Sequence, residues 1–461
     1  MKYISTRGLA PALSFEDAML TGLALDGGLY VPEHIPKISQ DEILSLRGCR
    51  YQEIAFRIIK PFLGNAFEDD ELTDIIEKAY ADFSHTACAP LVELEANHFL
   101  LELFHGPTLA FKDFAMQLIG QLFQVVLKRR GKRVTIIGAT SGDTGSAAIE
   151  AFKGLDSVNT FILFPDGRVS DVQRRQMTTA KEDNVHAIAV NGTFDDCQSR
   201  VKDMFNDHKF RSEVQLAGIN SINWARVLAQ VVYYFSSAIS LGAPSRKVSF
   251  TVPTGNFGDV FAGYIAKEMG LSIDRLVVAT NQNDILHRCL SGNGYHTTEV
   301  ASSISPSMDI QISSNFERAL FFAYRQDANK ISKLMEQLKQ NNGFDISDDA
   351  LDALSKHYSS GMATEVETSD TIKCMLTSSG QLLCPHTAIG VKVAKELRDN
   401  EVPMVTLATA HPAKFPAAVK KASKATPELP GRMGDLFERS EQTLKVDNDL
   451  VQLKNLIIDR I

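Results

Sequence analysis

The chain passes from a strand into a helix through one short stretch, residues 105–113, which read His105-Gly106-Pro107-Thr108-Leu109-Ala110-Phe111-Lys112-Asp113. Residues 99–104 before it read as a strand. After it, apolar residues recur every three or four positions as far as Val126, which predicts a helix with one apolar face. Because ligands of open α/β sheets bind where strands give way to helices, this stretch is a candidate site.

Lys112 lies at the start of this predicted helix, where the helix dipole disfavours a cation. Apolar surroundings and positive potential both lower the pKa of a lysine, which frees its amine for reaction. Lys112 is therefore a candidate nucleophilic amine. The alternative is a lysine that simply extends into solvent.

A second loop follows a β-branched strand at residues 134–137 and opens a helix; it reads Gly138-Ala139-Thr140-Ser141-Gly142-Asp143-Thr144-Gly145. It is neither a GxGxxG motif nor a P-loop, because its glycine spacing differs and the Lys-Ser/Thr pair is missing. Its glycines and hydroxyl residues still present backbone N–H groups to an anion such as a carboxylate. An ordinary capped helix start is the alternative.

A third loop of the same kind reads Pro253-Thr254-Gly255-Asn256-Phe257-Gly258-Asp259. A glycine-rich turn between a buried strand and a helix forms a phosphate cradle from backbone amides and the helix dipole. Asp259 would have to face away from a phosphate bound there.

Together the three loops indicate one cofactor. A reactive lysine, an anion loop of carboxylate size and a phosphate cradle are what pyridoxal phosphate requires. A nicotinamide cofactor would need GxGxxG followed by an acidic residue about 20 positions later, and the sequence lacks that pattern.

The rest of the chain alternates strands with helices of 10 to 15 residues, which predicts an α/β protein with mostly parallel sheets covered on both faces. Residues 1–95 read as mostly helical, and residues 325–370 as a polar, helical elaboration. Neither an internal repeat nor a low-complexity linker interrupts the pattern. The length of 461 residues is that of about three domains.

The composition is that of an ordinary globular protein, with 44% hydrophobic and 23% charged residues, which excludes collagen, coiled coils and disulfide scaffolds. The net charge of −8 disfavours a general nucleic-acid-binding role. The basic run at residues 128–133 is interpreted as a helix C-terminus closed by Gly131.

Six isolated cysteines without metal spacing indicate neither a zinc site nor disulfides, so we expect no bound metal and a reducing compartment. The N-terminal residues lack the apolar core of a secretory signal, and no stretch is long and apolar enough to span a membrane. These features predict a cytoplasmic protein.

Several segments in combination resemble the threonine synthase family, in the longer form found in many bacteria and fungi. They are Leu25–Pro32, Phe104–Asp113, Ser141–Gly145, Asn220–Arg226, Gly255–Asp259, Ser305–Ile310, Ser314–Arg318 and Ala410–Phe415. The resemblance runs from residue 1 into the 410s.

The resemblance implies a fold-type-II pyridoxal-phosphate enzyme with two open α/β domains and an added, mostly helical N-terminal domain. The N-terminal domain would comprise residues 1–95. A large cofactor-binding domain would comprise 96–132 and 246–461, and a smaller mobile domain 133–245.

The family also implies roles for single residues. Lys112 would bond covalently to the cofactor and act as the catalytic acid–base group. The other residues lining the cofactor would be Gly255, Asn256, Phe257, Gly258 and Asp259, chiefly at its phosphate, with Thr409 near the pyridine nitrogen. The α-carboxylate of the substrate would face Ser141, Gly142, Asp143 and Thr144.

The implied reaction converts O-phospho-L-homoserine and water to L-threonine and phosphate, so a second phosphate site is required. Candidates are Asn223, Arg226 and Lys414, each of which could instead be a helix cap or a surface charge. One alternative function is that of another fold-type-II lyase, such as a serine/threonine dehydratase; a second is a catalytically silent binding protein of the same fold. A monomer or homodimer is expected.

Overall fold

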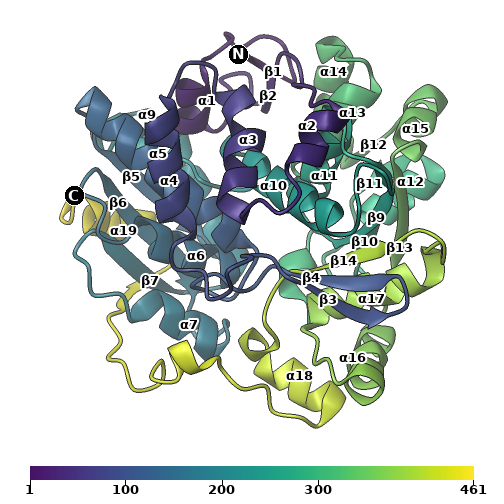
Figure 1. Cartoon of the computed structure of the whole chain (residues 1–461). Coiled ribbons are helices and arrows are strands. Elements are labelled where there is room, and N and C mark those ends of the chain that lie inside the picture. Colours follow the sequence, from purple (N-terminus) through teal and green to yellow (C-terminus); the bar gives the residue numbers. More distant parts are fainter.

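The computed structural model describes residues 1–461 and contains two separate, mostly parallel sheets with helices around them (Figure 1). In spatial order, the strands of the larger sheet are β13 (Tyr358–Met362), β10 (Ile273–Thr280), β9 (Val248–Pro253), β14 (Met404–Ala408), β4 (His98–Glu102) and β3 (Leu91–Glu95). All neighbours in it are parallel except β3, which runs antiparallel to β4.

The smaller sheet is parallel throughout. Its strands, in spatial order, are β15 (Leu444–Asp447), β7 (Val185–Asn191), β6 (Val158–Pro165), β5 (Val134–Ala139) and β8 (Leu216–Ala217). Every residue of β6 is buried, as expected of a central strand that is covered on both faces. The predicted α/β class with mostly parallel sheets is confirmed.

Five helices carry site residues at their first turns. They are α5 (Lys112–Arg130), α6 (Asp143–Phe152), α10 (Trp224–Ser240), α11 (Gly258–Met269) and α17 (Pro385–Leu397). Helix α10 is buried along most of its length and contacts both α5 and α11. One hydrophobic core of 95 residues therefore runs from the N-terminal segment through both sheets.

The basic run at the end of α5 behaves as predicted. The helix ends at Gly131, whose φ of 58° is left-handed, and its last turn contains Lys128, Arg129 and Arg130. Arg129 and Arg130 both pair with Glu16 of the N-terminal region. Both arginines therefore form ion pairs within the protein.

The N-terminal region is mostly helical, as expected, and lies over α5 and α10 (Figure 1). It comprises β1 (Tyr3–Ser5), α1 (Phe15–Thr21), β2 (Tyr30–Pro32), α2 (Gln40–Ser45), α3 (Tyr51–Leu63) and α4 (Asp69–Tyr80). Trp224 of α10 is fully buried against Tyr3 and Phe62, with ring centroids 5.9 Å away in both cases. This contact fixes the start of α10.

The remaining helices and short strands complete the fold. They are α7 (Asp171–Thr178), α8 (Phe194–Asn206), α9 (His208–Glu213), α12 (Ile285–Gly292), β11 (Gly294–His296), η1 (Pro306–Met308), α13 (Phe316–Ala323), α14 (Ala328–Asn341), β12 (Gly343–Asp345), α15 (Asp348–Ser355), α16 (Glu365–Ser379), η2 (Pro412–Lys414), α18 (Pro416–Ser423), η3 (Gly431–Met433) and α19 (Leu450–Ile458). The elaboration at 325–370 is largely helical, but it also supplies the edge strand β13.

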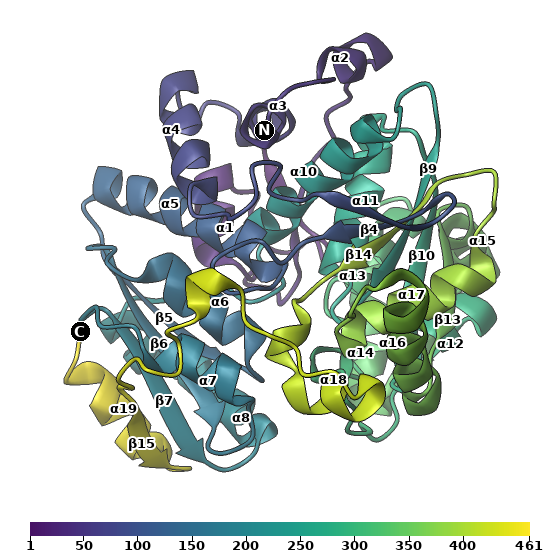
Figure 2. The same ribbon diagram turned by 60° about the horizontal axis from the view of Figure 1, so that its bottom comes forward.

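The sheets differ from the expected domain division at the two ends of the large domain. Strand β15 pairs within the smaller sheet, and Leu453 and Ile457 of α19 join its core, although both elements lie in 246–461, the range expected for the large domain. Figure 2 shows the yellow C-terminal segment crossing from α18 to β15 beside β7. Strand β3, assigned to the N-terminal domain, pairs with β4 of the larger sheet.

No helix is both long enough and apolar enough to cross a lipid bilayer. All six cysteines are free thiols, and four of them are buried.

Candidate active site

Lys112 and Thr409 are brought together because two loops run side by side at the carboxyl edge of the larger sheet. Strand β14 ends at Ala408, whose carbonyl accepts the N–H of Leu103 at 3.0 Å. One step on, the carbonyl of Thr409 accepts the N–H of Phe111 at 2.8 Å. The first residue of α5 is therefore held beside the end of β14.

The amine of Lys112 is buried but not tightly paired. The residue is 9% exposed, and its Nζ lies 3.7 Å from Oδ2 of Asp143 and 4.6 Å from the centroid of the Phe111 ring. Burial lowers the pKa of Lys112, and the cations of Arg226 and Lys414 act in the same direction, whereas Asp143 opposes them. The site thus favours the free amine relative to an exposed lysine.

The loop before α6 is shaped by a threonine and a glycine. The hydroxyl oxygen of Thr140 accepts the N–H groups of Gly142 and Gly145, both at 2.9 Å. Gly142 has φ 137°, and a Cβ there would lie 2.3 Å from the side chain of Gln173, so only glycine fits. Ser141 and Thr144 are left facing the cavity.

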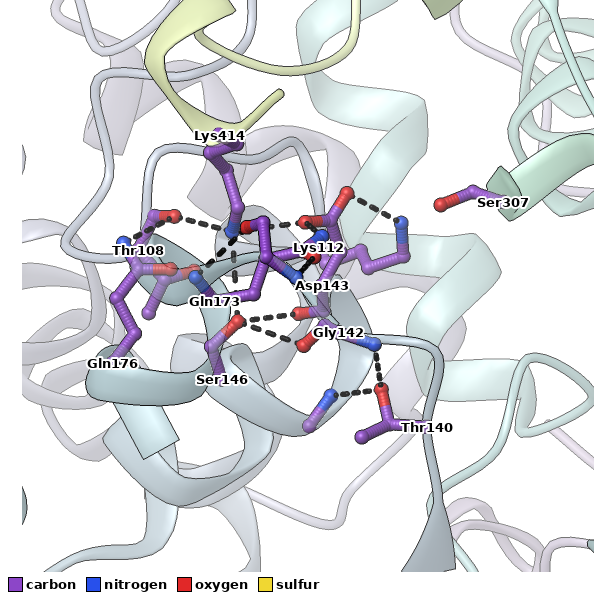
Figure 3. A network of polar contacts seen from close by, with 12 residues as sticks. Thr108, Lys112, Thr140, Gly142, Asp143, Ser146, Gln173, Gln176, Ser307 and Lys414 are labelled. Carbon is purple, nitrogen blue, oxygen red and sulfur yellow. Dashed lines mark hydrogen bonds and ion pairs between the residues drawn. The ribbon is translucent and has the colours of Figure 1, made fainter. Parts of the chain in front are cut away.

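Asp143, in the first turn of α6, is a buried carboxylate with three polar neighbours (Figure 3). Its Oδ1 lies 3.0 Å from Nζ of Lys414 and accepts Nε2 of Gln173 at 2.9 Å, while Oδ2 faces Lys112. Burial by itself would raise the pKa of Asp143, but the ammonium groups of Lys414 and Lys112 hold it well below its ordinary value. The carboxylate therefore stays ionised.

The turn before α11 has no room for a side chain at Gly255. A Cβ on Gly255 would lie 2.8 Å from the carbonyl oxygen of Ser307, so no side chain fits there. Phe257 has φ 62° and places Gly258 at the first position of α11, whose first-turn N–H groups have no partner within the helix. The turn has the form of an anion cradle.

Asp259 does not point its carboxylate into this cradle as a free group. Its Oδ1 accepts the hydroxyl of Thr254 and the N–H of Val260. Burial raises the pKa of Asp259. Its Oδ1 is thus hydrogen-bonded within the turn, although Asp259 also lines the cavity.

Arg226, in the first turn of α10, is buried yet incompletely satisfied. One terminal nitrogen donates to the carbonyl of Ile219 at 3.3 Å, and its Nε has no partner. Burial lowers the pKa of Arg226 to about 10, against the opposing effect of Asp259. A buried guanidinium with an unused donor is a site for an anion.

Asn223 lies three residues before Arg226 but does not face the same space. Its Oδ1 caps α10 by accepting the N–H of Ala225, and its Nδ2 donates to the carbonyls of Met19 and Gly218. All of its hydrogen-bonding groups are used, so Asn223 acts as a helix cap that ties α10 to the N-terminal region.

These residues surround one cavity of about 580 Å³. The predicted residues that line it are Lys112, Ser141, Asp143, Thr144, Arg226, Gly255, Asn256, Gly258, Asp259 and Thr409. Four others do not line it: Gly142, Asn223, Phe257 and Lys414. Lys414 is fully buried behind Asp143, and Phe257 packs against Phe316 and Tyr358.

Sequence reasoning missed His386, in the first turn of α17, and Ser307. The N–H of Ser307 donates to Nε2 of His386 at 3.2 Å, and both line the cavity. Burial lowers the pKa of His386 to about 4, so its imidazole is neutral. Pro385 marks the start of a helix in the sequence, but nothing there indicates which side chains meet it. No group of three His, Cys, Asp or Glu side chains could hold a metal.

The cavity fits pyridoxal phosphate. It holds a buried amine for the aldehyde, a glycine turn at the start of α11 for the phosphate, and a neutral hydroxyl at Thr409 beside the amine's loop. The chemistry of these groups matches the cofactor's aldehyde, phosphate and ring.

Comparison with known proteins identifies the family. Models described as "Threonine synthase N terminus", "Pyridoxal-phosphate dependent enzyme" and "Threonine synthase, C-terminal" match residues 2–80, 84–407 and 387–457. A threonine synthase of Pseudomonas aeruginosa is 52% identical over 99% of this chain and 98% of that protein. The chain belongs to the threonine synthase family. The predicted resemblance is therefore confirmed, as is the pyridoxal-phosphate dependence of the enzyme.

Two solved structures of the family share the fold over the whole chain. The pyridoxal-phosphate-bound threonine synthase from Brucella melitensis has a TM-score of 0.98 and 55% identity, covering 100% of this chain and 99% of that one. The threonine synthase from yeast has a TM-score of 0.94 and 39% identity, covering 100% and 98%. The dehydratase-type alternative is not favoured, because the N- and C-terminal matches are specific to threonine synthase.

Proposed function

We propose that this chain converts O-phospho-L-homoserine and water to L-threonine and phosphate, using pyridoxal phosphate. The observation that carries the proposal is one cavity that combines a buried amine at Lys112, a glycine cradle at Gly255 and a buried Arg226 with an unused donor. A phosphorylated substrate and a phosphorylated cofactor need two anion sites, and the cavity offers two of different construction.

For the cofactor, we propose that Lys112 bonds its aldehyde and that the backbone of residues 255–259 holds its phosphate. Thr409 would lie near the ring nitrogen, where a neutral hydroxyl leaves the ring less protonated than a carboxylate would. When bound, pyridoxal phosphate supplies an electron sink that makes the substrate's C–H bonds acidic.

Lys112 is the proposed proton carrier at Cα and Cβ of the substrate. A general base works best when its pKa lies near the working pH, and burial moves the pKa of Lys112 in that direction. The nearby carboxylate of Asp143 stabilises the amine when it carries a proton. The same group can then release that proton later in the reaction.

The loop before α6 is the proposed site of the substrate's α-carboxylate. Ser141 and Thr144 offer hydroxyl groups to the cavity at the start of a helix, where an anion is favoured. Asp143, which is ionised and paired, is unsuited to contact a carboxylate directly. Asp143 instead interacts with the ammonium groups of Lys112 and Lys414.

Arg226 is the proposed ligand of the substrate's phosphate, and Lys414 and Asn223 are not assigned to it, because their donors are already used. An arginine fork suits a phosphate dianion. Gln230, one turn along α10, also lines the cavity.

The proposed function is tested by incubating the purified protein with O-phospho-L-homoserine, with and without added pyridoxal phosphate. Phosphate and L-threonine should form in equal amounts and depend on the cofactor. L-Serine and L-threonine serve as competing substrates. Release of ammonia from them, without turnover of O-phospho-L-homoserine, would indicate a dehydratase instead.

We also propose that the protein works in the cytoplasm as a monomer or homodimer and without nucleic acid. The net charge of −8 supports the absence of nucleic acid, and the six free cysteines support a reducing compartment. Light scattering after size-exclusion chromatography measures the oligomeric state.

A further inference from the structure

Lys414 is a buried cation whose donors are all used by the protein. It lies at the end of η2, just beyond β14 of the larger sheet, and none of its surface is exposed. Its Nζ is 3.0 Å from Oδ1 of Asp143, 2.7 Å from the carbonyl oxygen of Thr108 and 3.5 Å from the hydroxyl of Ser146. An ammonium has three N–H groups, so no donor is left for a substrate.

Asp143 connects Lys414 to Lys112 (Figure 3). Its Oδ1 takes both Lys414 and Gln173, which fixes the plane of the carboxylate, and its Oδ2 is left to face Lys112 at 3.7 Å. Two buried ammonium groups thus share one buried carboxylate.

This sharing limits how strongly Asp143 can hold a proton on Lys112. In a buried environment, charges at 3 to 4 Å interact by several kcal/mol, so a second cation on the carboxylate weakens its pull on the first. The other charged or titratable groups that act on or respond to Lys112 are Arg226, Asp259 and His386.

We propose that Lys414 is a positioning residue, which holds Asp143 in place and takes up part of its charge, so that Lys112 can both accept and release a proton. The inference rests on the proposed function only in assigning proton transfer to Lys112. Asp143 and Ser146 belong to α6 beside the smaller sheet, whereas Lys414 follows the larger sheet. The ion pair between Asp143 and Lys414 therefore depends on the relative position of the two sheets.

The test is the pH midpoint at which the visible absorbance of the pyridoxal-phosphate-loaded enzyme changes, measured beside the pH dependence of kcat. Lys414→Met should raise the absorbance midpoint by about one pH unit or more. The carboxylate of Asp143 would then stabilise the protonated nitrogen of Lys112 without sharing its charge with a second cation. Asp143→Asn should lower it. Lys414→Arg keeps the charge and should stay closer to the parent than Lys414→Met.

Two further variants keep the test decisive. Lys420→Met removes an exposed lysine of the neighbouring helix α18 and should leave the midpoint unchanged. The double variant Asp143→Asn with Lys414→Met leaves no unpaired buried charge from this pair, so it should fold even if a single variant does not, with a midpoint between those of the single variants.

A higher midpoint in Lys414→Met together with a lower midpoint in Asp143→Asn, and an intermediate midpoint in the double variant, support the proposal. A Lys414→Met midpoint equal to the parent's, or a shift in the same direction as that of Asp143→Asn, overturns it, as does a double variant outside the range of the singles. The absorbance is measured without substrate, so its result does not depend on turnover of O-phospho-L-homoserine. Failure of the proposed function would instead appear as a parent enzyme that does not turn over this substrate.

Discussion

Arg226 and Lys414 are both buried cations near Lys112, but they differ in what their donors contact. Lys414 has three acceptors within hydrogen-bonding reach and does not line the cavity. Arg226 has a single protein acceptor at 3.3 Å, leaves Nε without a partner and lines the cavity. The number of unused donors, rather than the charge, separates a ligand-binding cation from a structural one.

The amine that both cations influence should matter most. Lys112→Ala removes the proposed proton carrier and the attachment point of the cofactor, so turnover should fall by a factor of about 10³ or more. Borohydride reduction of the parent should fix the cofactor on Lys112, as seen by peptide mass. A label on any other lysine would contradict the assignment.

Arg226→Ala should cost on the order of a hundredfold in kcat/KM, about 3 kcal/mol of transition-state stabilisation, because an unpaired donor is lost from the proposed phosphate site. The visible absorbance of bound pyridoxal phosphate should persist, which separates substrate binding from cofactor binding. Near-normal kinetics would mean that Arg226, like Lys414, does not bind the substrate's phosphate.

The proposed site of the cofactor phosphate uses backbone N–H groups of residues 255–259 and not a side-chain cation. Gly255→Val adds a branched side chain where even a Cβ would lie 2.8 Å from the carbonyl oxygen of Ser307. The turn must then shift, so the affinity for pyridoxal phosphate should fall about tenfold or more. Cofactor titration measures this, and circular dichroism checks that the apo fold survives. Unchanged affinity would place the cofactor phosphate elsewhere.

The smallest effect on catalysis should come from Asn223→Ala. Its donors are all used, so the change should lower the free energy of unfolding by about 1–2 kcal/mol through loss of a helix cap and a buried hydrogen bond. Urea unfolding measures this loss. A large rise in KM with unchanged stability would return Asn223 to the substrate site.

The sequence predicted the parts of the site that depend on local pattern. Lys112, the Gly255 turn and the Ser141–Thr144 loop each lie between a strand and a helix. The first two lie at the carboxyl edge of the larger sheet, and the third lies at the carboxyl edge of the smaller sheet. The α/β class followed from the alternation of strands with helices and the cofactor from the three loops, and the family resemblance added the reaction.

Features that depend on distant partners could not be read from the chain. Asn223 and Arg226 are three residues apart on one helix, yet Asn223 is occupied by Met19, some 200 positions earlier, while Arg226 faces the cavity. Lys414 is likewise taken by Thr108 and Asp143. Strand β15 is four residues long and pairs with β7 far back in the sequence, so periodicity alone does not reveal it.

The central claim, that Arg226 and not Lys414 binds the substrate's phosphate, is tested most directly by inhibition of the loaded enzyme by inorganic phosphate. The inhibition constant should rise about tenfold or more in Arg226→Ala and stay near the parent value in Lys414→Met. A rise in Lys414→Met with no change in Arg226→Ala would contradict the account.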